Sequence, residues 1–161
     1  NAAGYDLDGR IQGLEKNPAN LLPIVMETAL GRSKSLDVFG NNYDTPDGTA
    51  IRDYIHVTDL ASAHIASLEY IMNKVKNITL NLASGKGYSV LDVIKTAEEI
   101  TKNKIPYKIV SRREGDPEKL VAISKFTKDT ICWECKYSQI ETIIDSMWKV
   151  YKMTKLKVLL Y

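Results

Sequence analysis

The chain has 161 residues, enough for about one ordinary domain that buries roughly 68–70% of its unfolded surface. With 44% hydrophobic and 26% charged residues, it has the composition of a soluble globular protein, not of a disordered or fibrous one. Its 22 basic and 20 acidic residues leave a net charge of +2, so we expect no nucleic-acid partner. No apolar run approaches the roughly 18 residues of a membrane span. The chain starts at Asn1 without a signal-peptide pattern, and we therefore expect a cytoplasmic protein, cut from a larger one, that does not contact a membrane.

The first half of the chain predicts two helices and two strands. They are, in order, a helix over 18–30, a strand over 35–39, a strand over 54–57 and a helix from Thr58 or Asp59 to about Lys74. Gly31 provides the stop signal of the first helix. Residues 41–48 contain Asn, Pro and Asp-Gly, the residues of turns, and predict a surface loop.

The second half continues this alternation. It predicts a strand over 78–83, a helix from Ser89 to about Asn103, a strand over 107–110, a charged loop over 112–117, a short extended piece over 120–123 and a helix over 139–152. Helices of 12–16 residues that alternate with strands indicate an α/β protein.

Cys132 and Cys135 form a C-x-x-C motif, which is typical of redox or zinc sites. A redox pair needs the start of a helix that follows a strand, whereas this pair lies in a loop-like setting. A structural zinc site needs four ligands, and His56 and His64 are nearly 70 residues away. We predict ordinary reduced cysteines, two structural histidines and no metal site.

Dinucleotide-binding domains begin with a glycine-rich turn between a strand and a helix, and this chain has no G-x-G-x-x-G. The pattern Tyr-x-x-x-Lys, in which lysine lowers the pKa of a proton-exchanging tyrosine, occurs at Tyr70 with Lys74 and at Tyr151 with Lys155. Both pairs end amphipathic helices, where each tyrosine continues the apolar face. We therefore predict core-edge tyrosines and assign no catalytic residue.

Arginines gather in two loops. Arg52 follows the Asp47-Gly48 turn, and Arg112-Arg113 precede Glu114-Gly115-Asp116-Pro117. The guanidinium fork fits phosphate oxygens, and a nearby carboxylate can accept hydrogen bonds from ribose hydroxyls. The spacing is equally compatible with solvated charges or structural salt bridges, so both interpretations stay open here.

Several longer motifs are more specific. They are Val38-Phe39-Gly40, Tyr43-Asp44-Thr45-Pro46-Asp47-Gly48-Thr49, Ile51-Arg52-Asp53-Tyr54-Ile55-His56-Val57, Asp59-Leu60-Ala61, Gly87-Tyr88-Ser89-Val90 and Arg112-Arg113-Glu114-Gly115-Asp116-Pro117, with Asn1-x-x-Gly4 at the start. Over about residues 1–151 the chain resembles the UDP-glucose 4-epimerase family of extended short-chain dehydrogenases/reductases. Relatives that act on other nucleotide sugars generally lack the segment from Tyr43 to Thr49.

The resemblance implies the carboxy-terminal, substrate-binding half of a Rossmann-type enzyme that interconverts UDP-galactose and UDP-glucose through an NAD-dependent 4-keto intermediate. Residues 1–154 would form the UDP-sugar-binding region, including elements that pack on the Rossmann domain, and residues 155–161 a tail of unknown role. The complete enzyme is expected to be a homodimer that binds NAD mainly through its amino-terminal half.

The resemblance also assigns roles to individual residues. Asn1 lies near the sugar and diphosphate, Asn20 and Leu21 approach the nucleotide, Val38 and Phe39 line the uracil pocket, Arg52 and Arg113 hold the diphosphate, Asp116 accepts from the ribose, and Leu120 lies beside the sugar. Leucine at position 120 leaves open whether an N-acetylated sugar also enters.

The family's catalytic Tyr-x-x-x-Lys and its glycine-rich loop lie upstream of Asn1. We therefore expect this chain alone neither to hold NAD tightly nor to epimerise, and to expose apolar faces around 54–71 and 78–83. Two alternatives remain: a non-catalytic nucleotide-sugar-binding module, and part of a related nucleotide-sugar decarboxylase or dehydratase.

Overall fold

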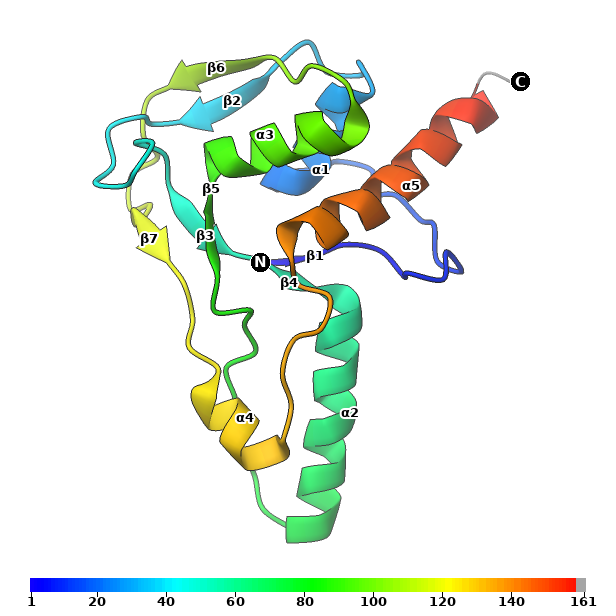
Figure 1. Ribbon diagram of the computed structural model, residues 1–161, viewed down its shortest axis with the longest axis vertical. Coiled ribbons are helices and arrows are strands. Elements are labelled where there is room, and N and C mark those ends of the chain that lie inside the picture. The colour runs from blue at the N-terminus through cyan, green and yellow to red at the C-terminus, as the bar shows by residue number, and fades with distance from the viewer. Residues whose placement is uncertain (159–161) are drawn as a thin grey trace.

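The computed structural model describes residues 1–158, with side chains through residue 154. Helices and strands alternate along the chain (Figure 1). They are β1 (Ala2–Ala3), α1 (Leu21–Ala29), β2 (Leu36–Phe39), β3 (Ile51–Asp53), β4 (Ile55–His56), α2 (Val57–Lys74), β5 (Gly87–Ser89), α3 (Val90–Thr101), β6 (Tyr107–Val110), β7 (Lys119–Leu120), α4 (Lys125–Ile131) and α5 (Ile140–Val158). The predicted α/β class is confirmed.

Three small sheets connect distant parts of the chain. Strands β1 and β4 pair in parallel, and so do β2 and β6. In the third sheet, β3 is the central strand, antiparallel to β5 and parallel to β7. Arg52 on β3 lies opposite Tyr88 on one side and Leu120 on the other. This sheet therefore brings three segments that are far apart in the sequence to one place.

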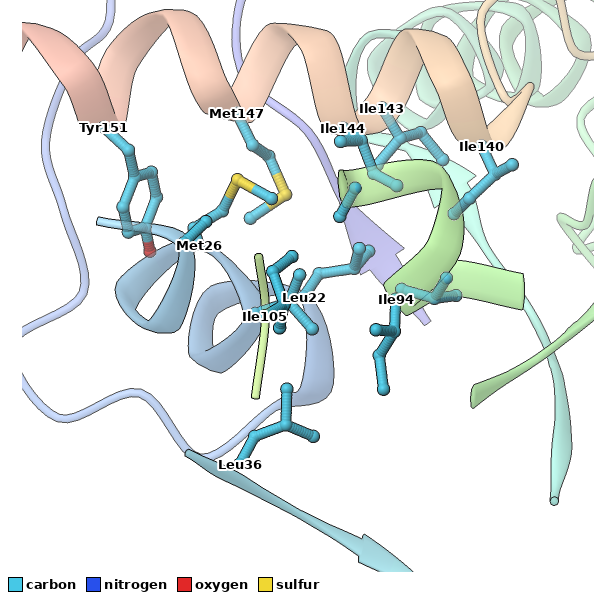
Figure 2. Packing of buried hydrophobic residues seen from close by; sticks show 14 of the residues in the cluster. Leu22, Met26, Leu36, Ile94, Ile105, Ile140, Ile143, Ile144, Met147 and Tyr151 are labelled. Carbon is cyan, nitrogen blue, oxygen red and sulfur yellow. The ribbon is translucent and has the colours of Figure 1, made fainter. Parts of the chain in front are cut away.

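The main hydrophobic core lies where α1, α3 and α5 meet on one face of the β2–β6 sheet, and Figure 2 shows its side chains from close by. The apolar positions of each helix point into this cluster, as their spacing predicts. Its labelled members in Figure 2 are Leu22, Met26, Leu36, Ile94, Ile105, Ile140, Ile143, Ile144, Met147 and Tyr151. Tyr151 is therefore a buried core residue, and Tyr70 on α2 is half-buried.

Helix α2 extends away from this core beside α4 (Figure 1). A smaller cluster contains only Ile55, Ala63 and Trp133 as buried members. The other side of α2 carries exposed large apolar residues, which are Ile65, Leu68, Ile71 and Met72, and Val75 is exposed directly after the helix. The expected exposed apolar face is thus present on α2. Within the described residues, no helix combines the length and apolarity needed to cross a membrane.

The strand predicted over 78–83 is wrong: these residues form no strand. The alternation of apolar and polar residues still appears in their exposure: residues 78, 80 and 82 are half-buried, whereas 79 and 81 are exposed. A strand also needs a hydrogen-bonded neighbour, and none lies beside this segment in the described chain. Instead the Asn81 carbonyl oxygen accepts from the Thr127 hydroxyl at 2.7 Å.

The start of α2 also differs from the prediction. The strand ends at His56, Val57 already belongs to the helix, and neither Thr58 nor Asp59 is the N-cap. His56 caps the helix, since its Nδ1 accepts from the Thr58 backbone N–H at 3.1 Å. Histidine is not among the preferred N-cap residues, so the sequence rule selected the neighbouring polar side chains.

Strands β1, β3 and β5 and helix α4 were not predicted. The strands are two or three residues long and depend on their pairing partners. Helix α4 has seven residues with little apolar periodicity. At the other end, α5 runs to Val158, beyond the predicted Lys152. The expected tail therefore begins within the helix backbone, and its residues 159–161 lie outside the described part.

Candidate nucleotide site

A cavity of about 880 Å³ opens between β1, α1, β2, β3 and the loop after β6. Seven predicted site residues lie in its lining: Asn1, Asn20, Leu21, Phe39, Arg52, Arg113 and Asp116. They come from five parts of the chain. The tertiary structure therefore brings most of the predicted set together around one space.

Two predicted residues lie elsewhere. Val38 faces inward on β2 and is buried in the core without lining the cavity, whereas Leu36, on the same face of the strand, contributes to both. Leu120 lies on β7 next to Arg52 in register, but its side chain is 61% exposed and does not line the cavity.

Asn1 and Asn20 reach the cavity from β1 and from the start of α1. The Asn1 side-chain Nδ2 donates to the Asp53 carbonyl oxygen at 2.9 Å, which ties β1 to the end of β3. Asn20 is the N-cap residue of α1 but makes no side-chain capping bond. The Asn20 amide therefore has no capping role at the helix and belongs to the cavity lining.

Arg52 and Asp116 form an ion pair across the cavity wall, with Nη2 and Oδ1 3.2 Å apart. Arg52 Nη1 also donates to the Ile51 carbonyl oxygen at 2.9 Å. A guanidinium carries five N–H donors, and these two bonds leave three without a protein acceptor among the described residues. Arg52 can therefore keep its ion pair with Asp116 and still donate hydrogen bonds to a bound anion.

Arg113 lies flat on Phe39, with its guanidinium carbon 3.7 Å from the ring centroid. A cation over a ring face is attracted by the ring quadrupole. Arg113 also lines the cavity, and among the described residues no side chain forms an ion pair with its guanidinium. Phe39 and Arg113 therefore form one composite wall, with an aromatic side and a cationic side.

Tyr54 also lines the cavity, and burial raises its pKa to about 12. Burial likewise raises the pKa of Tyr151 above its ordinary value. A tyrosine that exchanges protons near neutral pH needs the opposite shift. Both phenols therefore stay protonated, which agrees with a structural role for Tyr151.

The two cysteines are not arranged for redox chemistry. Cys132 is the C-cap of α4, at the end of a helix instead of the start. Burial raises the pKa of Cys135, whose thiol donates to the Ala83 carbonyl oxygen at 3.4 Å. Among the described residues, no three His, Cys, Asp or Glu side chains lie close enough together to hold a metal ion.

Dinucleotide cofactors need a glycine-rich turn and an open helix N-terminus for the pyrophosphate. Helix α2 follows β4 without a glycine and is capped by His56. Helix α3 follows β5, but its first turn is closed by the reciprocal bonds of Ser89 and Asp92. Neither strand–helix turn fits NAD, so we assign no step to a cofactor on these residues.

The cavity contains further residues that the sequence did not single out, including Tyr5, Glu15, Asp37 and Met147. Met147 belongs to the apolar face of α5, and periodicity alone placed that face only in the core. Tyr5 and Glu15 lie in the segment between β1 and α1, which carries no helix or strand signal. Their proximity to the cavity depends on long-range packing.

Comparisons with known proteins show which proteins the chain resembles. The family model "NAD dependent epimerase/dehydratase family" matches residues 7–83. The chain is similar to the UDP-glucose 4-epimerase of Halalkalibacterium halodurans, with 41% identity over 94% of this chain and 46% of the relative. It is 42% identical to the human UDP-glucose 4-epimerase, over 84% of this chain and 38% of that protein.

Solved structures give the same result. A UDP-glucose 4-epimerase from Stenotrophomonas maltophila, with bound NAD and formylated UDP-arabinopyranose, superposes with a TM-score of 0.92 at 34% identity, over 98% of this chain and 47% of that one. The enzyme from Bifidobacterium longum, in complex with NAD+ and UDP, gives 0.86 at 36% identity, over 97% and 46%. The chain spans about half the length of these relatives. It is similar to the NAD dependent epimerase/dehydratase family over residues 7–83, and to UDP-glucose 4-epimerases over nearly its whole length.

Proposed function

We propose that this chain is the substrate-binding part of a UDP-glucose 4-epimerase and that its cavity holds the uridine diphosphate of UDP-glucose and UDP-galactose. The observation that carries the proposal is the convergence of seven predicted site residues on one cavity. That cavity offers arginines for phosphates, a carboxylate for hydroxyls and an aromatic face for a base.

The charges suit a nucleoside diphosphate better than a neutral ligand. Arg52 and Arg113 reach the cavity from separate segments, so two guanidinium groups can meet two phosphates. Asp116 already accepts one bond from Arg52, and a carboxylate has further lone pairs for a ribose hydroxyl. Phe39 supplies an apolar surface next to these polar groups.

Firm binding at the unreactive end suits an epimerase, because the sugar has to present both faces while the nucleotide stays in place. We assign the NAD cradle and the proton-exchanging tyrosine to polypeptide beyond this chain, since burial raises the pKa of both Tyr54 and Tyr151, the tyrosines at the cavity whose pKa is shifted most. The complete enzyme would be a cytoplasmic homodimer, as the resemblance implies.

Calorimetric titration of the purified chain with UDP tests the proposal. We expect saturable binding that Arg52→Ala weakens about ten- to hundredfold, because a hydrogen-bonded charge pair contributes about 1.5–3 kcal/mol. Arg10→Ala is the matched control: Arg10 pairs with Asp6 and Asp8 outside the cavity and should leave UDP affinity unchanged. No binding by the unmodified chain would overturn the proposal.

The same polypeptide should not convert UDP-galactose to UDP-glucose when NAD is added. Product analysis after long incubation measures this directly. Conversion above background would show that the catalytic groups lie within this chain after all. For this chain we expect UDP binding without conversion of UDP-galactose. A full-length protein that binds UDP but does not convert UDP-galactose would favour the non-catalytic module.

A further inference from the structure

Two consecutive arginines stack on two aromatic rings on either side of Gly40. Arg113 covers Phe39 at 3.7 Å, and Arg112 covers Tyr43 at 3.6 Å, each measured from the guanidinium carbon to the ring centroid. Arg113 lines the cavity, whereas Arg112 and Tyr43 do not. The pair outside the cavity thus repeats the geometry of the pair inside it.

Gly40 makes the outer stack possible. Its φ is +83°, and a Cβ there would lie 2.6 Å from Arg112 Cγ and 2.8 Å from Tyr43 Cε2. The Gly40 backbone N–H also donates to the Val110 carbonyl oxygen at 2.9 Å. Backbone, arginine stem and tyrosine ring therefore close on one another where β6 ends.

Tyr43 is a fixed platform for this stack. It is 5% exposed, its backbone N–H donates to the Gly48 carbonyl oxygen at 3.0 Å, and its own carbonyl oxygen accepts from Thr45 at 2.8 Å. Within the described residues its hydroxyl has no hydrogen-bond partner. The ring, and not the hydroxyl, is what the neighbouring structure uses.

The loop after β6, residues 111–118, is held by hydrogen bonds and an ion pair at the end nearest β7. The Asp116 backbone N–H donates to the Arg113 carbonyl oxygen at 3.3 Å, and Asp116 pairs with Arg52. The Glu118 carbonyl oxygen then accepts from Ile51 at 2.8 Å. At the near end, just after the hydrogen bond between Gly40 and Val110, the side chain of Arg112 lies on Tyr43 and that of Arg113 lies on Phe39.

We propose that Arg112 is a positioning residue: its stack on Tyr43 fixes the near end of the loop, so that Arg113 lies on Phe39 with its N–H edge toward the bound diphosphate. The inference rests on the proposed function, because the diphosphate is its ligand. Arg112 acts through Arg113 and does not contact the ligand.

A double-mutant cycle on UDP affinity tests this. Arg112→Ala should weaken binding about two- to fivefold, the size of a cation–π contact at an exposed site. In an Arg113→Ala background the same change should have no further effect, because nothing remains to be positioned. Independent, multiplying losses would overturn the proposal, since they indicate a direct charge contribution from Arg112. So would an unchanged affinity in Arg112→Ala.

Tyr43 supplies the matched controls. Tyr43→Phe keeps the ring and removes only the unpartnered hydroxyl, so UDP affinity should not change. Tyr43→Leu removes the ring face and should reproduce the loss seen in Arg112→Ala. A Tyr43→Leu variant that binds UDP like the unmodified chain, with the same unfolding midpoint, would contradict the stack as the cause.

Hydrogen exchange separates failure of this inference from failure of the proposed function. Arg112→Ala should speed amide exchange at Asp116, whose N–H is held by the Arg113 carbonyl oxygen, with or without UDP. Exchange at Ile94 in the core of α3 should stay the same. If the unmodified chain fails to bind UDP, the proposed function fails, and unchanged exchange at Asp116 would overturn the positioning role on its own.

Discussion

The two ends of the molecule are stabilised in different ways. The end around α1, α3 and α5 buries a large apolar cluster, and Figure 2 shows its side chains meeting from all three helices. The end around α2 and α4 has three buried apolar residues and leaves a row of large apolar side chains exposed. The candidate nucleotide cavity lies against the first end.

Hydrogen bonds to a buried carboxylate help to stabilise the end around α2 and α4, where few apolar residues are buried. Asp59 is 1% exposed and accepts from the Lys136 and Tyr137 backbone N–H groups at 3.0 and 2.9 Å. The Ser138 hydroxyl donates to the same carboxylate at 2.6 Å. A buried carboxylate thus fixes the segment before α5 where apolar packing is sparse. The cavity therefore rests against the larger apolar core, while α2 carries large apolar side chains that the described residues leave exposed.

The largest effect should come from the core. Ile143→Ala should lower the free energy of unfolding by about 2–5 kcal/mol, because it removes a fully buried side chain and leaves a cavity. Ile65 on α2 is 61% exposed, so Ile65→Ala should change the free energy of unfolding by less than about 0.5 kcal/mol. Urea unfolding measures both. Equal losses would show that the face of α2 is covered in the isolated chain.

A smaller loss is expected at the carboxylate. Asp59→Asn should lower the free energy of unfolding by about 1.5–3 kcal/mol, because the amide replaces one acceptor oxygen with an NH2 donor that faces backbone N–H groups. Asp129→Asn is the control in the same region, since Asp129 is exposed on α4. Thermal and urea unfolding give the values. If both variants unfold alike, the α2–α4 end does not depend on this network.

The smallest effect concerns His56, which lies at the boundary of the two ends. Its Nδ1 accepts from Thr58 and its Nε2 lies 3.3 Å from the Ser146 hydroxyl oxygen on α5. The Ser146 hydroxyl donates to Ile143, so Nε2 is the donor and the ring is neutral. Burial lowers the pKa of His56 below its ordinary value of about 6.5.

The lowered pKa of His56 sets the direction in which the free energy of unfolding changes with pH. As pH falls below about 6.5, the unfolded chain takes up a proton before the folded chain does, so the free energy of unfolding falls, by at most about 1.4 kcal/mol per pH unit. Unfolding at pH 7.5, 6.5 and 5.5 measures the slope. His56→Gln should remove this part of the slope and His64→Gln should keep it. A slope that survives in His56→Gln would assign it to other groups.

Much of the proposed site followed from sequence motifs and from the family resemblance that they carry. The motif around Arg52 and the segment from Arg112 to Asp116 identified residues that meet at the cavity. Val38 did not follow, because strand alternation turns it toward the core while its neighbour Phe39 faces the cavity. Tyr43 and Arg112 were recognised only as parts of motifs. Their stack depends on two loops that are almost 70 residues apart.

The amino-acid sequence alone determined the α/β class, the long helices and the types of side chain available for a diphosphate, since periodicity, turn residues and guanidinium chemistry are local properties. The tertiary structure decided which of those side chains share a cavity, which short strands form, and that residues 78–83 form none. The physical reason is that a strand, an ion pair or a stack exists only when a partner far along the chain is brought within a few ångströms.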